Sequence, residues 1–237
     1  GLSVGKRMQQ AVMTGVSYMV PFVAAGGLLL ALGFLVGGYQ IGEQVNGIDP
    51  WKQFVTEYSL TNLPPTTVDF DGKEVAFAYP AFALYLGSVL FATGQAAMGF
   101  VVAALSGYIS YAMAGRPGIA PGFVGGAISV TLGAGFIGGL VTGLLSGAVA
   151  MWLGNQKVPK VLQSLMPVVI IPLGTSLVVG LVMFLLLGRP LAAILSGLQN
   201  WLTSMSGSSA LLLGVILGLM MCFDLGGPVN KAAYLFA

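Results

Sequence analysis

Apolar runs longer than the ~18 residues that mark a membrane-crossing helix recur along this chain. Of its 237 residues 57% are hydrophobic and 7% are charged, and the mean hydropathy is +0.93. This composition excludes an ordinary soluble domain. We therefore predict an all-α polytopic membrane protein with about six spans, with kinked and broken helices and one interfacial amphipathic helix.

The composition also excludes several kinds of chemistry. Histidine is absent, which removes the usual proton shuttle, the commonest metal ligand and any phosphohistidine carrier. Cys222 is the single cysteine, so no internal disulfide can form. The net charge of +2 comes from scattered bases and gives no indication of a nucleic-acid partner. We expect no cofactor, metal site or catalytic residue in this chain, and the lipid bilayer is its first expected partner.

The first predicted span covers residues 11–37. It contains Pro21, which kinks a helix because it removes a backbone hydrogen bond. Residues 38–79 hold six of the seven acids and are predicted to form an aqueous loop. Within that loop, Asp71-Gly72 indicates a hairpin turn.

Residues 80–114 are apolar for longer than one crossing. As a single helix they would reach about 52 Å against ~30 Å of hydrocarbon, so we expect two short spans with a turn near Gln95. The next stretch, 115–126, reads Gly-Arg-Pro-Gly-Ile-Ala-Pro-Gly-Phe-Val-Gly-Gly. Its two Pro-Gly pairs, the second at Pro121, predict that no regular helix forms there. Arg116 is interpreted as an anchor at the membrane edge, with an anion contact as the alternative.

Glycines recur every four residues in the following predicted span, residues 127–153. They are Gly135, Gly139, Gly143 and Gly147. On a helix they form one strip, which allows another helix to pack backbone to backbone. The pattern therefore indicates a seam between helices.

A fifth span is predicted over residues 161–188, with its end at Arg189-Pro190. Residues 191–205 then place apolar side chains at helical spacing and polar side chains opposite. This pattern is typical of an amphipathic helix that lies in the membrane interface. A packed connector helix fits the same pattern.

The last apolar run stops before it can cross the membrane. It begins near Ala210 and ends at Phe223, about 21 Å later. The segment Asp224-Leu-Gly-Gly-Pro-Val-Asn-Lys231 therefore lies at membrane depth, where ionisable groups and broken helices typically face a solute pathway. The predicted substrate-binding residues are Asp224, Gly226, Gly227, Asn230 and Lys231.

The bases give weak information on orientation. Lys6 and Arg7 precede the first span, and no base follows it until Lys52. This favours a cytoplasmic N-terminus and an external acidic loop. Up to Arg189, however, the bases divide four to four between the two sides, whichever way residues 80–114 cross.

Two of these motifs resemble a known family. Residues 115–126 and residues 223–234, Phe-Asp-Leu-Gly-Gly-Pro-Val-Asn-Lys-Ala-Ala-Tyr, are similar to signature stretches of the fructose-family membrane component, enzyme IIC, of the bacterial phosphoenolpyruvate-dependent phosphotransferase system. Residues 16–27 and 170–173 resemble the same family. The similarity extends over nearly all of the chain.

The resemblance implies an architecture like that of the glucose-superfamily IIC proteins, which form homodimers. Residues 1–188 are then the membrane scaffold and dimer-interface helices, with the aqueous loop 38–79. Residues 189–207 are the interfacial connector, and residues 208–237 are the start of a truncated transport domain. We accordingly expect the chain to be a piece of a longer polypeptide.

The resemblance also implies a function. Such a protein takes up fructose, or a related hexose, across the bacterial inner membrane while a partner IIB domain, supplied by IIA, phosphorylates the sugar. The chain is then the membrane subunit of a sugar phosphotransferase, and the phosphoryl carrier lies elsewhere. At the sugar, Asp224 accepts hydroxyl hydrogen bonds, Asn230 donates and accepts, and Lys231 donates.

Three alternatives stay open at this point. Asp224 and Lys231 can simply neutralise each other and hold the broken helix. The chain can be an ion-coupled secondary transporter, which also uses a broken helix with an acid. It can also be a non-transporting membrane scaffold in which the glycine strip is a docking seam.

Overall fold

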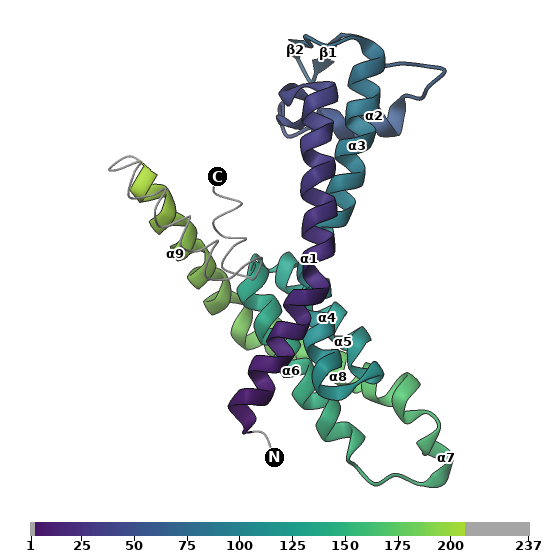
Figure 1. The fold of residues 1–237 in the computed structure, drawn as a ribbon, viewed down its shortest axis with the longest axis vertical. Coiled ribbons are helices and arrows are strands. Elements are labelled where there is room, and N and C mark those ends of the chain that lie inside the picture. The colour runs from purple at the N-terminus through teal and green to yellow at the C-terminus, as the bar shows by residue number, and fades with distance from the viewer. Residues whose placement is uncertain (1–2, 207–237) are drawn as a thin grey trace. The chain divides into compact units, whose positions relative to one another are not determined.

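The structure, a computed structural model, describes residues 3–206 (Figure 1). The chain packs as two compact units. Unit 2 comprises residues 21–100, and unit 1 comprises the residues before and after it. The division falls at Pro21 inside helix α1 (Val4–Gly37) and at Phe100, between α3 (Ala81–Gly99) and α4 (Val101–Ala114).

Long apolar helices dominate the described residues. Four stretches have the length and composition to cross a membrane: Val4–Gly37, Ala81–Ala114, Gly135–Gly154 and Met166–Ser204. A multi-pass helical membrane protein is therefore confirmed in outline. The predicted sixth span, residues 210–223, lies outside the described residues.

The predicted turn near Gln95 is wrong. Gly94 and Gln95 lie inside α3, and the helical pattern is interrupted at Phe100 instead. A Cβ atom at Gly94 would lie 2.8 Å from the backbone nitrogen of Leu30 and 2.9 Å from the carbonyl oxygen of Gly26. Position 94 is therefore a glycine because α3 packs closely on α1 within unit 2. From the sequence alone, a glycine at a close helix contact looks the same as a glycine in a turn.

Unit 2 contains a β-hairpin, which corrects the all-α prediction. Strands β1 (Thr67–Phe70) and β2 (Lys73–Ala76) pair antiparallel, with Phe70 opposite Lys73. Asp71 and Gly72 connect them with φ angles of 52° and 94°, as a two-residue hairpin turn of the primed type requires. The hairpin turn predicted from Asp71-Gly72 is confirmed.

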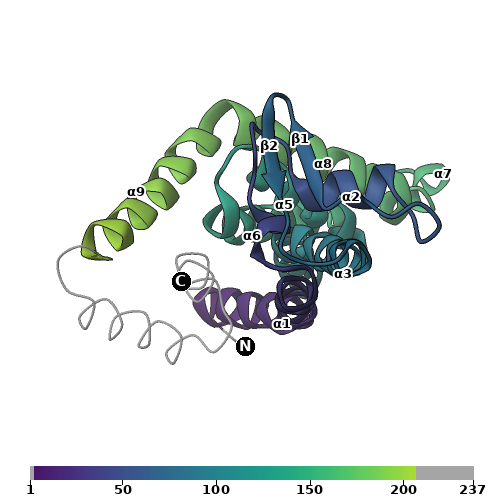
Figure 2. The same ribbon diagram turned by 90° about the horizontal axis from the view of Figure 1, so that it is seen from above.

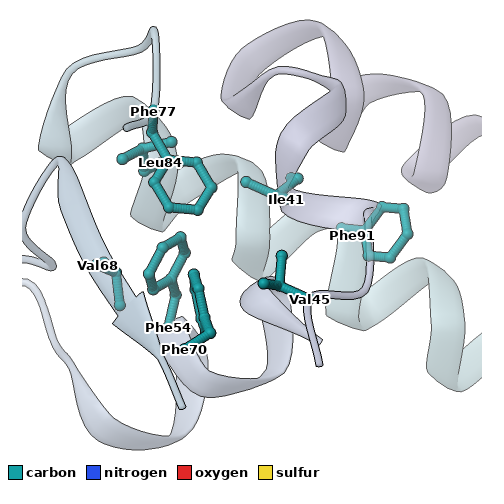
Figure 3. Close-up of a cluster of buried hydrophobic side chains, with 8 residues drawn as sticks. All are labelled: Ile41, Val45, Phe54, Val68, Phe70, Phe77, Leu84 and Phe91. Atoms are coloured by element: carbon teal, nitrogen blue, oxygen red, sulfur yellow. The ribbon is translucent and has the colours of Figure 1, made fainter. Parts of the chain in front are cut away.

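The predicted aqueous segment 38–79 is folded around its own hydrophobic core, together with residues of α3. It adds a short 3₁₀-helix, η1 (Tyr39–Gly42), and helix α2 (Pro50–Glu57) to the hairpin (Figure 2). Eight buried side chains form the core (Figure 3): Ile41, Val45, Phe54, Val68, Phe70, Phe77, Leu84 and Phe91. The rings of Phe54 and Phe77 pack edge to face with their centroids 5.2 Å apart, an arrangement that the ring quadrupoles favour.

Unit 1 is a bundle built around α4. Its remaining elements are the 3₁₀-helix η2 (Arg116–Gly118), α5 (Ile119–Thr131), α6 (Gly135–Gly154), α7 (Lys160–Gln163), the π-helical turn η3 (Met166–Ile170), α8 (Ile171–Val182), the π-helical turn η4 (Met183–Leu187) and α9 (Gly188–Ser206). Helix α4 packs against both α5 and α6 (Figure 1). Leu105 and Ile109 on α4 are fully buried.

Two boundary predictions in unit 1 are wrong. The stretch 115–126 does form a helix from Ile119 onward, because Pro121 lies in the first turn of α5, where a missing backbone N–H costs little. The predicted span 127–153 is therefore divided between α5 and α6, with a turn at residues 132–134.

The helix predicted to end at Arg189-Pro190 continues through that dipeptide. In the π-helical turn η4, the N–H of Gly188 donates to the carbonyl of Met183, five residues earlier. This wider turn precedes Pro190, whose ring a regular α-helix would crowd. Helix α9 follows and includes the predicted amphipathic segment 191–205, with Leu202 fully buried and Gln199 and Asn200 exposed.

Candidate functional site

The residues predicted to bind substrate are outside the described part of the chain. Asp224, Gly226, Gly227, Asn230 and Lys231 all follow residue 206. Their roles remain predictions from the sequence. The described residues instead contain two other features that bear on function: the packed interior of unit 1 and its charged end.

The stretch 115–126 brings α5 onto α4 at backbone distance. A Cβ atom at Gly122 would lie 2.6 Å from the Cα of Gly107, and one at Gly126 would lie 2.6 Å from the Cα of Ala103. Both distances are far inside van der Waals contact, so only glycine fits. We call this contact the α4–α5 seam. Glycine here serves helix packing, as is common where lipid replaces water.

The glycine strip of α6 lies against α4 as well. A Cβ atom at Gly139 would lie 2.9 Å from Val102, one at Gly143 would lie 2.8 Å from the Cβ of Ile109, and one at Gly147 would lie 2.8 Å from the Cβ of Met113. Gly135 differs, since it has a φ of 51° and faces Leu195 of α9. Helix α4 is therefore enclosed by close glycine contacts from both α5 and α6.

Hydroxyl groups line the interior between these helices. Ser106 on α4 and Thr142 on α6 are fully buried, and their hydroxyl oxygens are 2.7 Å apart. One turn further along α6, the Ser146 hydroxyl donates to the carbonyl of Pro121 at 3.4 Å. Polar groups are expensive in a bilayer, so membrane helices turn their hydroxyl groups toward one another or toward a pathway. A hydroxyl-lined interior is therefore a recurrent feature of helices that associate or enclose a pathway.

Two further hydroxyls in unit 1 are buried without a hydrogen-bond partner in the described part of the chain. They belong to Ser110 on α4 and Thr175 on α8, each with no exposed surface. Sequence reasoning missed this interior. The signal was present, since Ser106 and Ser110, and likewise Thr142 and Ser146, are four residues apart and therefore share a helix face.

Replacing Ser110 by Ala should leave the thermal stability of the protein unchanged or raise it slightly. No hydrogen bond is lost, and the desolvation cost of an unpaired hydroxyl, about 1–3 kcal/mol, is removed. Thermal unfolding in detergent measures the effect, with Ser106→Ala as the matched change that does break a bond. A clear loss of stability in Ser110→Ala alone would show that the hydroxyl has a partner, such as ordered water.

The bases of unit 1 gather at one end, here called the cationic end. Its members are Lys6, Arg7, Arg116, Lys157 and Lys160, all exposed. The start of α1 meets the ends of α4 and α6 there, since Arg7, Met113 and Met151 line one cavity. Ala114 and Val158 pack into one cluster at the same end. Residues 3–20 and 101–206 contain no Asp or Glu, so within them these charges have no carboxylate partner.

The remaining base of the described part of unit 1 is at the opposite end. Arg189 follows Gly188, which lies against Leu132 in the turn between α5 and α6. The division of bases is thus five to one within the described part of unit 1, where the sequence alone divided the same six bases four to two. The difference arises because α5 is a separate helix, which places Arg116 on the same side as Lys157 and Lys160.

Four membrane-length helical stretches and a glycine-packed bundle with a hydroxyl-lined interior define a polytopic helical membrane protein. The family model of the phosphotransferase system EIIC matches residues 13–237. The chain belongs to this family, and the resemblance seen in the sequence is confirmed.

Curated relatives extend the comparison. The chain is 36% identical to the fructose-like permease IIC component 2 of Escherichia coli K12, over 98% of this chain and 54% of the relative. It is 36% identical to the fructose-specific EIIC component of Haloferax volcanii, over 97% and 57%. It is 42% identical to the fructose-specific EIIB'BC component of Xanthomonas campestris, over 95% and 33%. The chain thus spans little more than half the length of the first two relatives. No solved structure matches it.

Proposed function

We propose that this chain is part of a phosphotransferase-system transporter that moves fructose, or a related hexose, across the bacterial inner membrane. The observation that carries the proposal is the family match over residues 13–237, joined to relatives that are named for fructose. The sugar is phosphorylated by a IIB domain as it is taken up, and the chain is the membrane subunit of that phosphotransferase.

The partners follow from the same comparison. The relative from Xanthomonas campestris is named EIIB'BC and that from Bacillus subtilis EIIABC, which supports IIB and IIA as phosphoryl-transfer partners of this chain. We further propose a glucose-superfamily IIC-like fold with about six spans and a homodimer. Residues 1–188 supply its scaffold, residues 189–207 its interfacial connector and residues 208–237 the start of the transport domain.

The proposed sugar site is the segment that begins at Asp224. A hexose offers hydroxyl groups, which need paired acceptors and donors in a dry pocket. Asp224 accepts, Asn230 does both, Lys231 donates, and the backbone at Gly226 and Gly227 adds groups at close range. Ionisable residues within a membrane segment are expensive, so Asp224 and Lys231 in this apolar part of the chain support a solute-binding role.

The experiment that tests the function is uptake by vesicles that contain the full-length protein. Sugar should accumulate as a sugar phosphate only when phosphoenolpyruvate and the phosphoryl-transfer proteins are present. An ion gradient without a phosphoryl donor should drive no uptake. Uptake that follows an ion gradient instead would identify an ion-coupled transporter, and dimerisation without sugar binding would identify a scaffold.

The cationic end supports an N-terminus in the cytoplasm. Cytoplasmic ends of membrane helices carry an excess of Lys and Arg, and five of the six bases in the described part of unit 1 lie at this end. In this orientation the segment 38–79 lies outside the cell. An impermeant maleimide added to intact cells should therefore label the variant Leu60→Cys, made in a Cys222→Ser background, because the Leu60 side chain is 67% exposed. Lys160→Cys should be labelled only after lysis, and the reverse pattern would contradict the orientation.

A further inference from the structure

A cavity of about 460 Å³ opens beside the first turns of α1, at the cationic end of unit 1. We call it the α1 pocket. Its polar lining comes from Arg7, Gln10 and Thr14, and its apolar lining includes Met8, Met113 and Met151. The volume falls within the ~300–1,000 Å³ typical of small-molecule sites. The pocket thus combines one cation with a largely apolar wall.

Within residues 3–20 and 101–206, the cation in this pocket has no carboxylate partner. Arg7 is exposed, makes no side-chain ion pair within residues 3–206, and belongs to a part of the chain without Asp or Glu. Lys6 and Arg116 add positive potential nearby. Guanidinium groups bind phosphate oxygens with two parallel hydrogen bonds, so Arg7 is suited to a phosphate group at a membrane surface.

The rest of the lining fits a hydrocarbon chain. The Thr14 hydroxyl already donates to the carbonyl of Gln10 at 2.9 Å, so the polar groups left for a ligand are mainly Arg7 and the Gln10 amide. Met8 and Met151 are 40% and 39% exposed, so this wall is open at the protein surface. Methionine side chains are flexible and polarisable, and they adapt to irregular apolar ligands.

We propose that the α1 pocket binds an anionic phospholipid. The head-group phosphate contacts Arg7 and Gln10, and an acyl chain runs along Met8, Met113 and Met151. Basic pockets between membrane helices on the cytoplasmic side bind anionic head groups in this way. The apolar wall favours a lipid over the acidic surface of a docked protein, which would present no hydrocarbon chain to the methionines. The pocket lining shares no residue with the proposed sugar site, and the proposal assigns the protein a lipid ligand.

Native mass spectrometry of the purified full-length protein tests the proposal, with phosphatidylglycerol titrated against phosphatidylcholine. Arg7→Gln should weaken phosphatidylglycerol binding about fivefold, the value of one basic contact at a membrane surface. Lys6→Gln is the matched control, since it removes the same charge one residue away but lies outside the pocket, and it should change affinity less than about twofold. Ala112→Phe fills the apolar side without a charge change and should also weaken binding.

Several results would overturn the proposal. Equal losses in Arg7→Gln and Lys6→Gln would mean diffuse attraction to the membrane. Full competition by glycerol 3-phosphate would mean that a free phosphate compound is the ligand. Unchanged lipid affinity in Arg7→Gln, with more IIB needed for half-maximal sugar phosphorylation in phosphatidylcholine vesicles, would mean a protein-docking surface. Elution volume and thermal midpoint confirm that each variant is folded.

Discussion

Asp224→Asn in the full-length protein should abolish sugar uptake and lower sugar affinity by about 100-fold, because a carboxylate that accepts hydroxyl hydrogen bonds contributes about 1.5–3 kcal/mol per bond. The substitution preserves the shape of the side chain and one of its acceptor oxygens, but it removes the charge that strengthens these bonds. Sugar binding by the purified protein and uptake by vesicles measure the two effects separately.

The matched control for this change is Glu57→Gln. Glu57 is exposed at the end of α2, and its replacement removes the same charge from the folded segment 38–79. Uptake by that variant should remain normal, and both variants should insert into the membrane at wild-type levels. Normal sugar affinity in Asp224→Asn would refute the anchor role and favour the alternative in which Asp224 and Lys231 neutralise each other.

Gly126→Ala should destabilise unit 1 by about 1–3 kcal/mol, which corresponds to a fall in the unfolding midpoint on the order of 5 °C. The added methyl group would lie 2.6 Å from the Cα and 3.0 Å from the nitrogen of Ala103, and 2.8 Å from the carbonyl oxygen of Val102. All three are backbone atoms of the buried helix α4, so no side chain can rotate away. The α4–α5 seam must open for the variant to fold.

Gly197→Ala is the control for this prediction. Gly197 lies within α9, and a Cβ atom there would meet nothing within 4 Å. Alanine is a better helix former than glycine by about 1 kcal/mol, so this variant should be as stable as the wild type or more stable. Thermal unfolding of both variants in the same detergent decides the matter. Equal midpoints would mean that the seam is looser than its distances indicate.

Features that depend on local chemistry were predictable from the sequence. The turn at Asp71-Gly72 was found because two residues in the left-handed region are needed, and Asp and Gly adopt it readily. The long apolar runs were found because a bilayer demands them. The family was found because residues 115–126 and 223–234 resemble its signature stretches, and the family match over residues 13–237 agrees.

Helix boundaries were not predictable, because the same residue types serve two purposes. Gly94 resembles a turn residue, yet it lets α3 pack on α1. Pro121 resembles a helix breaker, yet it lies in the first turn of α5, where proline is tolerated. Pro190 continues a helix because a π-helical turn precedes it. In each case tertiary packing or the position within the helix decided the outcome.

The candidate site is a different case. The substrate-binding residues from Asp224 to Lys231 were predicted because a charged side chain inside a membrane is energetically unfavourable unless it has a function. They remain predictions. The buried hydroxyls of unit 1 were not predicted, because Ser, Thr and Gly at this spacing are common in membrane helices for packing alone. Only the contacts, such as the 2.7 Å between Ser106 and Thr142, distinguish an interior face from one that meets lipid.

The hairpin of β1 and β2 has a practical consequence for imaging. Its tip is open at Gly72, where a Cβ atom would meet nothing within 4 Å, while Phe70 and Val68 behind it are anchored in a hydrophobic core. An antibody fragment that grips this tip would be held rigidly on unit 2. It would give cryo-electron microscopy a fiducial that projects from a membrane protein.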